Sequence, residues 1–555
     1  MTESRPWLTN YPGGVPANID ADAYASLNDL IDEIMHKYRS KKAFACMGKE
    51  LTFAQVDRYA DRFGAYLQSR GLKPGDKIAL MMPNLLQYPI ALFGCLRAGL
   101  IIVNTNPLYT PREMKHQFTD SGAKAIVIAE NFASNLETII GETEIQTVIL
   151  TSIGEMLGFP KKQIVNYVVR NVRKMVPKYD IPNAISFGEA LKQGRKFALQ
   201  RHMGSPEEVV ALQYTGGTTG VSKGAMLTNR NLVSNMQQVF AYGRPFVKEG
   251  EEIALCALPL YHIYAFTVNC LAFMGMGAMN VLITNARDLD TVIKTFKSYQ
   301  ISLVTGVNTL FNAMVNHKDF ASLDFSHLRL SLGGGMAVQR PVAERWQQIT
   351  GCFLSEGYGL TEASPVVTTN PLDGSGRLGT IGLPLPSTDV RVVDDQGIVQ
   401  GPGGIGELQV RGPQVMKGYF NRPEETQKTI LDGWLCTGDI GTMDEDGYFK
   451  IVDRKKDMIN VSGFNVFPNE IEEVVAGHDK VLEVAAVGVP DSKSGEVVKL
   501  YVVKKDKSLG EKELINYCRD NLTAYKVPKK VEFRKELPKT NVGKILRREL
   551  REENT

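Results

Sequence analysis

The chain has 555 residues, of which 43% are hydrophobic and 23% charged, a composition typical of ordinary globular proteins. This length exceeds what one hydrophobic core usually holds, so we expect at least two domains. Because 64 basic residues nearly balance 61 acidic ones, for a net charge of +3, the composition gives no reason to expect nucleic-acid binding.

The N-terminus and the cysteines bear on the location of the protein. Residues 1–20 lack a basic patch followed by an apolar run, so we expect no secretory signal. The 7 cysteines are odd in number, and no pair has C-x-x-C spacing. This pattern favours reduced, mostly buried thiols without a catalytic role, and a cytoplasmic location.

Helical and strand patterns alternate from about residue 51 onward. Residues 53–71 and 84–99 predict helices that end at glycines, while residues 77–82 and 100–104 predict short buried strands. Such alternation is typical of an α/β architecture with largely parallel strands. We therefore expect a large N-terminal domain of mixed and parallel sheets flanked by helices.

A basic segment follows at 161–178, reading KKQIVNYVVRNVRKMVPK, with six lysines and arginines and no acidic residue. On a helix, one face would carry Ile164, Val165, Val168, Val169, Val172 and Val176. Two interpretations stay open. The helix either packs this face on the body of the protein or lies on an anionic membrane, which would be the inner face of the cell membrane.

A glycine- and threonine-rich loop, YTGGTTGVSKGA, occupies residues 214–225 directly after a predicted strand at 209–213. Its four glycines allow the backbone to approach phosphate oxygens, and its hydroxyls and Lys223 supply donors and positive charge. No Gly-Lys-Ser/Thr sequence occurs, and the next helix is predicted to begin only after Thr228. The loop therefore predicts a triphosphate site that differs from the common P-loop.

No charged residue occurs from Ile253 to Ala286. Its apolar middle, residues 263–279, is at the lower limit for a membrane span and contains Asn269, Gly275 and Gly277. We therefore favour a buried helix with a flanking strand, which would be able to line a pocket for an apolar ligand.

The composition shifts near the C-terminus, where residues 432–470 are dense in glycine and aspartate, with a turn at 444–447. Beyond Pro468 the pattern predicts helices at 469–476 and 512–521, and strands at 484–489 and 499–503. These elements suffice for a small α+β domain. We place the boundary near 454–456, which gives domains at 1–454 and 455–555.

Together these segments resemble the adenylate-forming superfamily of acyl- and aryl-CoA synthetases, peptide-synthetase adenylation domains and beetle luciferases. After the 214–225 loop, matching blocks follow in order at 355–365 (SEGYGLTEASP), 406–420, 432–441 (DGWLCTGDIG), 452–468 and 537–550 (LPKTNVGKILRREL). The resemblance spans residues 25–550. Residues 85–117 and the hinge block are most similar to bacterial long-chain fatty acyl-CoA ligases.

The resemblance implies a reaction in two steps. ATP and a long-chain fatty acid give acyl-AMP and pyrophosphate, and coenzyme A, as co-substrate, then takes the acyl group and releases AMP. Alternatives are a ligase for a medium-chain or aryl acid, or an acyl-AMP ligase that delivers to a carrier protein. The latter usually carries an insertion before the C-terminal domain, and none is evident.

The resemblance also assigns the ATP site. Asp439 and Arg454 would contact the ribose, Tyr358 the adenine and Thr361 the α-phosphate. The full set is Tyr214, Thr215, Gly216, Gly217, Thr218, Thr219, Gly220, Lys223, Gly335, Tyr358, Gly359, Thr361, Asp439 and Arg454.

The catalytic residues implied by the resemblance are Lys544, Glu362 and Thr218. Bringing a carboxylate to a phosphate requires positive charge, which Lys544 would supply between the two anions. Glu362 carries the hard oxygen that Mg²⁺ prefers, and Thr218 would be the second contact to this metal.

The acyl and coenzyme A sites are implied in less detail. His262, Tyr264, Gly333 and Gly334, with Phe266 and residues 307–310, would border the acyl group, although His262 is equally consistent with a core histidine. Between the two steps the C-terminal domain would rotate about Lys456. This rotation would withdraw Lys544 and bring Gly463 to the pantetheine tunnel, where the absence of a Cβ allows close approach.

Overall fold

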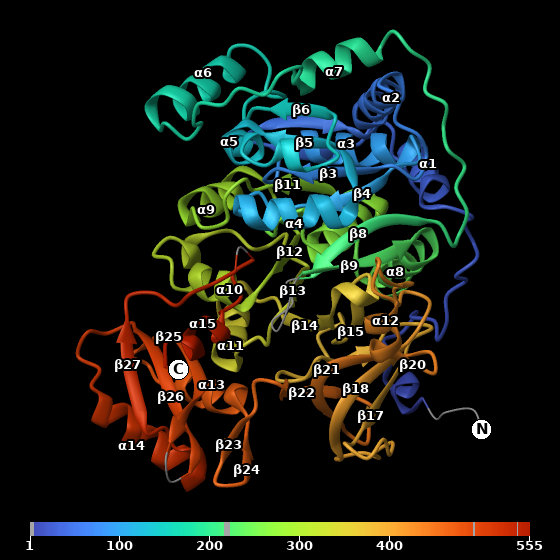
Figure 1. Ribbon diagram of the computed structural model, residues 1–555. Helices are drawn as coiled ribbons and strands as arrows, with labels where there is room; N and C mark the ends of the chain where they lie inside the picture. The colour runs from blue at the N-terminus through green and yellow to red at the C-terminus, as the bar shows by residue number, and fades with distance from the viewer. Residues whose placement is uncertain (1–4, 216–221, 492–493, 541, 555) are drawn as a thin grey trace.

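The computed structural model (Figure 1) describes residues 5–215, 222–491, 494–540 and 542–554. Among these residues the strands form four sheets, three in the large N-terminal part and one in the C-terminal part. Helices flank the N-terminal sheets, and the smaller C-terminal part, orange to red in Figure 1, is set to one side. The predicted α/β class, with a large N-terminal and a smaller C-terminal domain, is confirmed.

The first sheet carries the phosphate loop at one side. Its strand order is β19-β9-β8-β4-β3-β5-β6-β7, and the six strands from β8 to β7 in this order are parallel to one another. The strands are β3 (Lys77–Met81), β4 (Ile101–Asn104), β5 (Ala123–Ala129), β6 (Thr147–Thr151), β7 (Ile185–Ser186), β8 (Val209–Thr215), β9 (Lys223–Thr228) and β19 (Gly418–Tyr419). β8 and β9 are antiparallel, so the 214–225 segment joins the two strands of a hairpin.

The helices that accompany this sheet are α1 (Leu27–Lys37), α2 (Phe53–Ser69), α3 (Gln87–Arg97), α4 (Pro111–Ser121), α5 (Ala133–Glu137), α7 (Phe187–Gly194) and α8 (Asn229–Gly243). Of these, α2 and α3 lie close to the predicted ranges 53–71 and 84–99, and α8 begins after Thr228 as predicted. Thr228 caps α8 through a reciprocal capping box with Asn231, as its position before the helix predicts.

The second sheet has the order β16-β15-β14-β13-β12-β10-β11-β1-β2 and is parallel from β1 through β14. Its strands are β1 (Lys42–Cys46), β2 (Lys49–Thr52), β10 (Ile253–Cys256), β11 (Met279–Leu282), β12 (Leu303–Gly306), β13 (Leu330–Gly333), β14 (Leu354–Gly359), β15 (Val366–Thr369) and β16 (Leu383–Pro384). The helices α9 (Leu289–Ser298), α10 (Asn308–Val315) and α11 (Arg340–Thr350) connect or follow these strands. Gly306, Gly333 and Glu356 are in register, so β12, β13 and β14 present their carboxyl ends at one edge. Ligands of α/β sheets typically bind at such an edge.

The uncharged segment is buried, as expected. β10 and β11 flank a π-helix at Ala265–Phe273, and every residue of this π-helix is buried. Among the described residues, no helix has the length and apolar character that a membrane span requires. The segment is therefore a buried helix with flanking strands, although its helical turns are wider than the predicted ones.

The basic segment forms a shorter helix than its sequence predicts. α6 (Lys161–Tyr167) continues as a π-helical turn, Val168–Val172, and Lys174 then has a positive φ of 50°. Val176 thus lies beyond the helix. Because Ile164 and Val172 are exposed, the apolar face does not pack on the body as a whole.

The third sheet leads to the C-terminal part. Its strand order is β17-β18-β21-β20, and β22 pairs with β21. The strands are β17 (Asp389–Val393), β18 (Ile405–Arg411), β20 (Ile430–Leu431), β21 (Trp434–Met443) and β22 (Phe449–Arg454). The helix α12 (Pro423–Thr429) lies between β19 and β20 in the chain. The fourth sheet comprises β23 (Ile459–Val461), β24 (Phe464–Val466), β25 (Val481–Asp491), β26 (Gly495–Lys504) and β27 (Lys530–Arg534), with helices α13 (Pro468–Ala476), α14 (Glu511–Asn521) and α15 (Arg547–Glu552).

Separate hydrophobic cores support the C-terminal part. In the described portion of the chain, the clusters around Leu500 and Tyr501 draw their buried members only from residues 459–550. The boundary at residues 454 and 455, and any movement about it, stay predictions.

Candidate active site

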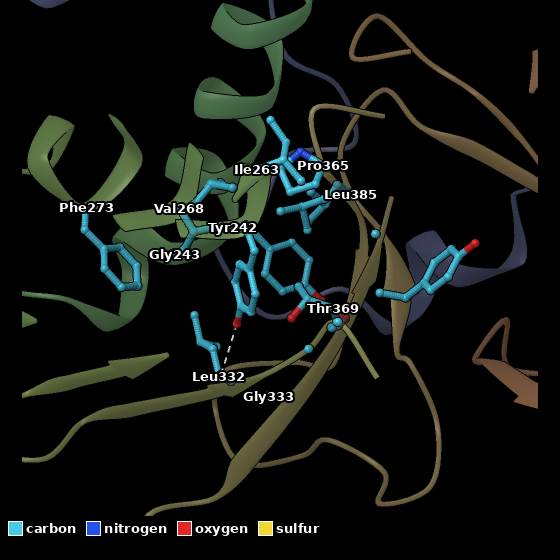
Figure 2. Close-up of a pocket in the computed structure, with 18 of the residues that line it drawn as sticks. Tyr242, Gly243, Ile263, Val268, Phe273, Leu332, Gly333, Pro365, Thr369 and Leu385 are labelled. Atoms are coloured by element: carbon cyan, nitrogen blue, oxygen red, sulfur yellow. Dashed lines mark hydrogen bonds between the residues drawn. The ribbon is translucent and has the colours of Figure 1, made fainter. Parts of the chain in front are cut away.

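A pocket of about 930 Å³, measured with its open mouth, lies at the carboxyl ends of β13 and β14 (Figure 2). Of the described site residues predicted from sequence, the pocket brings together His262, Tyr264, Gly333, Gly334, Gly335, Tyr358, Gly359, Thr361 and Lys544. Its polar end is formed by the loop after β13 and by the end of β14. The same pocket continues into an apolar end.

Asp439 and Arg454 flank the polar end from the third sheet. They are register partners on the antiparallel strands β21 and β22, and the Asp439 Oδ1 lies 3.1 Å from the Arg454 Nε. The Tyr358 hydroxyl donates to Asp439 Oδ2 at 2.7 Å. Burial, reinforced by the Asp439 charge, holds the pKa of Tyr358 well above its ordinary value, so its hydroxyl stays a donor. This arrangement presents a carboxylate and a guanidinium beside an aromatic face.

Lys544 reaches the polar end from the C-terminal part of the chain. A Cβ placed on Gly335 would lie 3.3 Å from the Lys544 Cε, and Gly335 has a φ of 78°, which favours glycine. Burial and, to a smaller extent, the nearby Arg454 charge lower the pKa of Lys544 to about 8, while Asp439 and Glu362 oppose this shift. The pocket therefore contains a cation whose charge is retained below about pH 8.

Glu362 sits on a short 3₁₀ turn after β14, and Tyr419 of β19 donates to its Oε1 at 2.7 Å. β19 in turn pairs with β9, so the 406–420 block ties this carboxylate to the phosphate-loop hairpin. Apart from its place in that block, no sequence pattern indicates this role for Tyr419. Among the described residues, no cluster of three or more histidine, cysteine or acidic side chains forms a metal cage.

The phosphate-loop hairpin is described only at its two ends. Gly216, Gly217, Thr218, Thr219 and Gly220 lie outside the described residues. Lys223 begins β9 and forms an ion pair with Glu425 of α12, a partner that the sequence did not indicate. The Tyr214 hydroxyl donates to Asp120 Oδ2 at 2.7 Å, so its ring is held towards α4.

His262 borders the other side of Lys544. The Tyr264 backbone N–H donates to His262 Nδ1 at 3.3 Å, which leaves the proton of a neutral ring on Nε2. Burial, with a smaller contribution from Lys544, lowers the pKa of His262 to about 3. His262 is thus a neutral, pocket-lining histidine at physiological pH.

The apolar end contains residues that the sequence analysis missed. It runs between α8 and the segment around the π-helix, as Figure 2 shows for Tyr242, Gly243, Val268 and Phe273. Its apolar lining comprises Val239, Tyr242, Gly243, Ile263, Val268, Phe273, Met276, Leu332, Leu372 and Leu385. The uncharged segment therefore does line an apolar pocket, as its composition indicated.

Two sequence-based expectations for the acyl wall, Phe266 and residues 307–310, lie outside the lining of this pocket, so their contact with an acyl group stays a prediction. Phe266 is fully buried in the main core and is not among the residues that line the pocket. Val307 and Leu310 also lie outside the lining, since the start of α10 faces the segment around Gly543 instead.

Gly463 and Lys456 lie away from this pocket. Gly463 is exposed in the β23–β24 hairpin with a φ of 86°, and a Cβ there would meet nothing within 4 Å. Lys456 is half-buried, and burial together with Arg454 lowers its pKa to about 8.

Comparisons with known proteins agree with this arrangement. Residues 31–420 match the AMP-binding enzyme family, and residues 470–544 match the AMP-binding enzyme C-terminal domain. The chain is 56% identical to a long-chain-fatty-acid–CoA ligase of Escherichia coli O157:H7, over 99% of this chain and 98% of that protein. It is 38% identical to the ligase of the same name from Bacillus subtilis (strain 168), over 100% and 99%. The crystal structure of the anthranilate CoA ligase AuaEII in complex with anthranoyl-AMP has a TM-score of 0.86, with 25% identity over 97% of this chain and 99% of that chain.

Proposed function

The chain belongs to the AMP-binding enzyme family, and we propose that it is an AMP-forming long-chain fatty acid–CoA ligase. It activates a fatty acid with ATP and transfers the acyl group to coenzyme A. The observation that carries this proposal is the continuity of the pocket, in which Lys544 stands between a polar end beside Asp439 and an apolar end beneath α8. A nucleotide fits the first end and an alkyl chain the second.

In the first step, a carboxylate oxygen of the fatty acid attacks the α-phosphorus of ATP, and the bond to the leaving pyrophosphate breaks. Asp439 accepts hydrogen bonds from the ribose hydroxyls, and Tyr358 packs on the adenine. The Lys544 ammonium lies between the carboxylate and the α-phosphate and offsets the charge that builds up as they meet. His262 is neutral and carries its proton on Nε2. It therefore offers the pocket a hydrogen-bond donor without adding a second buried cation.

Mg²⁺ fits this site as a partner of ATP. The Glu362 carboxylate is tied to the phosphate-loop hairpin through Tyr419 and the pairing of β19 with β9, and Mg²⁺ is usually bound by one or two carboxylates together with substrate phosphates. Glu362 would hold the ion, with Thr218 as the second contact. When bound, Mg²⁺ neutralises phosphate charge, and Tyr419 fixes the orientation of Glu362.

In the second step, the thiol of coenzyme A attacks the acyl carbonyl carbon and AMP leaves with the carboxylate oxygen. Residues 455–555 turn about Lys456 between the steps, which withdraws Lys544 and brings the Gly463 hairpin to the pocket. The exposed position of Gly463 in the present pose, away from the pocket, supports this order of events.

Substrate choice is tested with palmitate, octanoate and benzoate in the presence of ATP, Mg²⁺ and coenzyme A. Each buried methylene is worth about 0.8 kcal/mol. We therefore expect kcat/KM for palmitate to exceed that for octanoate by at least about tenfold. Faster reaction with benzoate would contradict a long-chain ligase and favour an aryl-CoA ligase. Acyl transfer to a phosphopantetheinylated carrier protein but not to coenzyme A would favour the carrier-protein alternative.

We also propose that the segment 159–178 contacts an anionic membrane surface from which the enzyme takes its substrate. Figure 1 shows α6 at the periphery of the molecule. Phe159 is 87% exposed, and the apolar side chains of Ile164, Tyr167, Val172 and Met175 are exposed beside six basic residues. Of these six, Arg170 pairs with Glu130. Such a combination suits a peripheral contact with lipid headgroups.

Liposome flotation tests this contact. We expect the wild type to float with anionic vesicles, and a variant with Lys161, Lys162, Arg173 and Lys174 changed to glutamate to stay in solution. Each lysine or arginine near such a surface is worth about 1 kcal/mol. Leaving Arg170 unchanged preserves its internal ion pair. Equal flotation of the two proteins would remove the proposal.

A further inference from the structure

The first half of α10 faces the C-terminal part of the chain. Its buried residues, Leu310, Phe311, Met314 and Val315, pack into the main core. Thr309 and Asn312 are three residues apart, so they lie on the same side of the helix, and both are partly exposed. Neither lines the pocket, and neither has a role in the chemistry described above.

Both side chains donate to backbone carbonyls of the C-terminal part. The Thr309 hydroxyl donates to the Gly543 carbonyl oxygen at 3.0 Å. The Asn312 amide donates through Nδ2 to the Leu482 carbonyl oxygen at 2.8 Å. Gly543 directly precedes Lys544, and Leu482 lies at the start of β25. The two bonds therefore join α10 to the loop that carries Lys544 and to the sheet behind it.

The two acceptors belong to one unit of the C-terminal part. The Lys539 ammonium lies 2.6 Å from Glu483 Oε1. This ion pair links β25 to the start of the lysine loop, the segment that runs from Lys539 to Lys544. Within this loop the Thr540 N–H donates to the Lys544 carbonyl oxygen at 2.7 Å, and the Lys544 N–H donates to Thr540 Oγ1 at 3.1 Å. Holding the Gly543 and Leu482 carbonyls thus fixes the position from which Lys544 extends.

The Asn312 donor and the start of α10 are themselves held in place by hydrogen bonds. Asn316 donates to Asn312 Oδ1 at 2.8 Å, which turns the Asn312 NH₂ group towards Leu482. Asn308 donates to Gln339 Oε1 at 3.1 Å and accepts from the Gln339 N–H at 3.0 Å, which anchors the start of α10 to the loop after Gly335.

Close approach at this contact depends on glycine. Gly543 has a φ of 85°, and a Cβ there would lie 2.6 Å from the Thr309 Oγ1, closer than real contacts allow. Val307 is adjacent to both Gly543 and Gly335, at 3.3 Å and 3.6 Å from the Cβ positions of these glycines. The start of α10 is therefore fitted between the pocket and the lysine loop.

We propose that Thr309 and Asn312 are positioning residues for the adenylation step. They hold the C-terminal part in the pose that places Lys544 in the pocket, and both bonds break when that part turns for the thioester step. This inference rests on the proposed two-step function. It adds to that function a docking contact that acts on the first step and not on the second.

The test measures the two half-reactions separately in the full-length protein. Adenylation is followed as pyrophosphate release from ATP and palmitate, and thioesterification as palmitoyl-CoA formation from supplied palmitoyl-AMP and coenzyme A. In the double variant Thr309→Val and Asn312→Asp, both shapes are kept and both donors are lost. We expect adenylation to slow about ten- to a hundredfold from the loss of two hydrogen bonds. Thioesterification should be unchanged or faster, because the competing pose is weakened.

Thr309→Ser is the matched control, since it keeps the hydroxyl and should restore the adenylation rate lost in Thr309→Val. Equal slowing of both half-reactions would overturn the inference, because a general structural defect does not discriminate between them. An unimpaired adenylation rate in the double variant would also overturn it. If the wild type forms no palmitoyl-AMP, it is the proposed function that fails.

Discussion

Replacing Lys544 with alanine should strongly slow acyl-AMP formation while sparing the transfer of supplied acyl-AMP to coenzyme A. Lys544 is a buried cation at the junction of the two ends of the pocket, next to Gly335. Removing a preorganised group that stabilises transition-state charge typically slows a reaction by about 10²–10³-fold. The measurement is pyrophosphate release from ATP and palmitate, compared with palmitoyl-CoA formation from palmitoyl-AMP.

The pH dependence of kcat/KM for adenylation provides a second test of the role of Lys544. Burial lowers the pKa of Lys544 to about 8 in the free protein, so its charged form is lost as the pH rises through that value. The kcat/KM for adenylation by the wild type should therefore fall above about pH 8, because kcat/KM reports groups of the free enzyme. The residual activity of Lys544→Ala should lack this decline. Equal loss of both half-reactions in Lys544→Ala would contradict the assignment of Lys544 to the first step alone.

Replacing Gly463 with tryptophan should have the opposite effect, with thioesterification lost and adenylation retained. In the present pose a side chain at this position meets nothing within 4 Å, so adenylation has no steric reason to suffer. After the proposed rotation the same side chain would fill the path of the pantetheine arm. We expect thioesterification to slow by at least about a hundredfold, the scale on which misplaced reactants lose rate.

Gly463→Ala is the control for backbone strain. With a φ of 86°, any residue other than glycine is strained here, by roughly 1–2 kcal/mol. Alanine carries this strain without the bulk of tryptophan, so it should keep most of the thioesterification rate. If alanine and tryptophan impair thioesterification equally, strain and not obstruction is the cause, and Gly463 does not line the coenzyme A path.

Much of the architecture follows from local sequence signals. Residues 53–71 have helical periodicity and end at a glycine, and this prediction agrees with α2 (Phe53–Ser69) within two residues. In the structure, Thr52 and Gln55 form the capping box that begins α2. The blocks around Tyr358, Asp439 and Lys544 were identified as parts of one site although they are distant in the chain. The structure brings them together because β14, β21 and the lysine loop converge at the pocket.

Other features depend on tertiary packing, which a sequence pattern does not express. Residues 265–273 are uncharged and buried throughout, so periodicity shows neither that they form a π-helix nor which of them line the pocket. The contact between Thr309 and Gly543 joins residues 234 positions apart, and neither residue type signals it. Tyr419 and Glu425 likewise acquire their partners, Glu362 and Lys223, only through the folding of β19 and α12 against the phosphate-loop hairpin.

The central claim is that a long-chain fatty acid is activated through an acyl adenylate and passed to coenzyme A. Its most direct test is to incubate the protein with palmitate labelled with oxygen-18 in both carboxylate oxygens, together with ATP, Mg²⁺ and coenzyme A, and to analyse the products by mass spectrometry. We expect palmitoyl-CoA, pyrophosphate and AMP that carries one labelled oxygen on its phosphate. Formation of ADP and phosphate, or of AMP without the label, would contradict this claim.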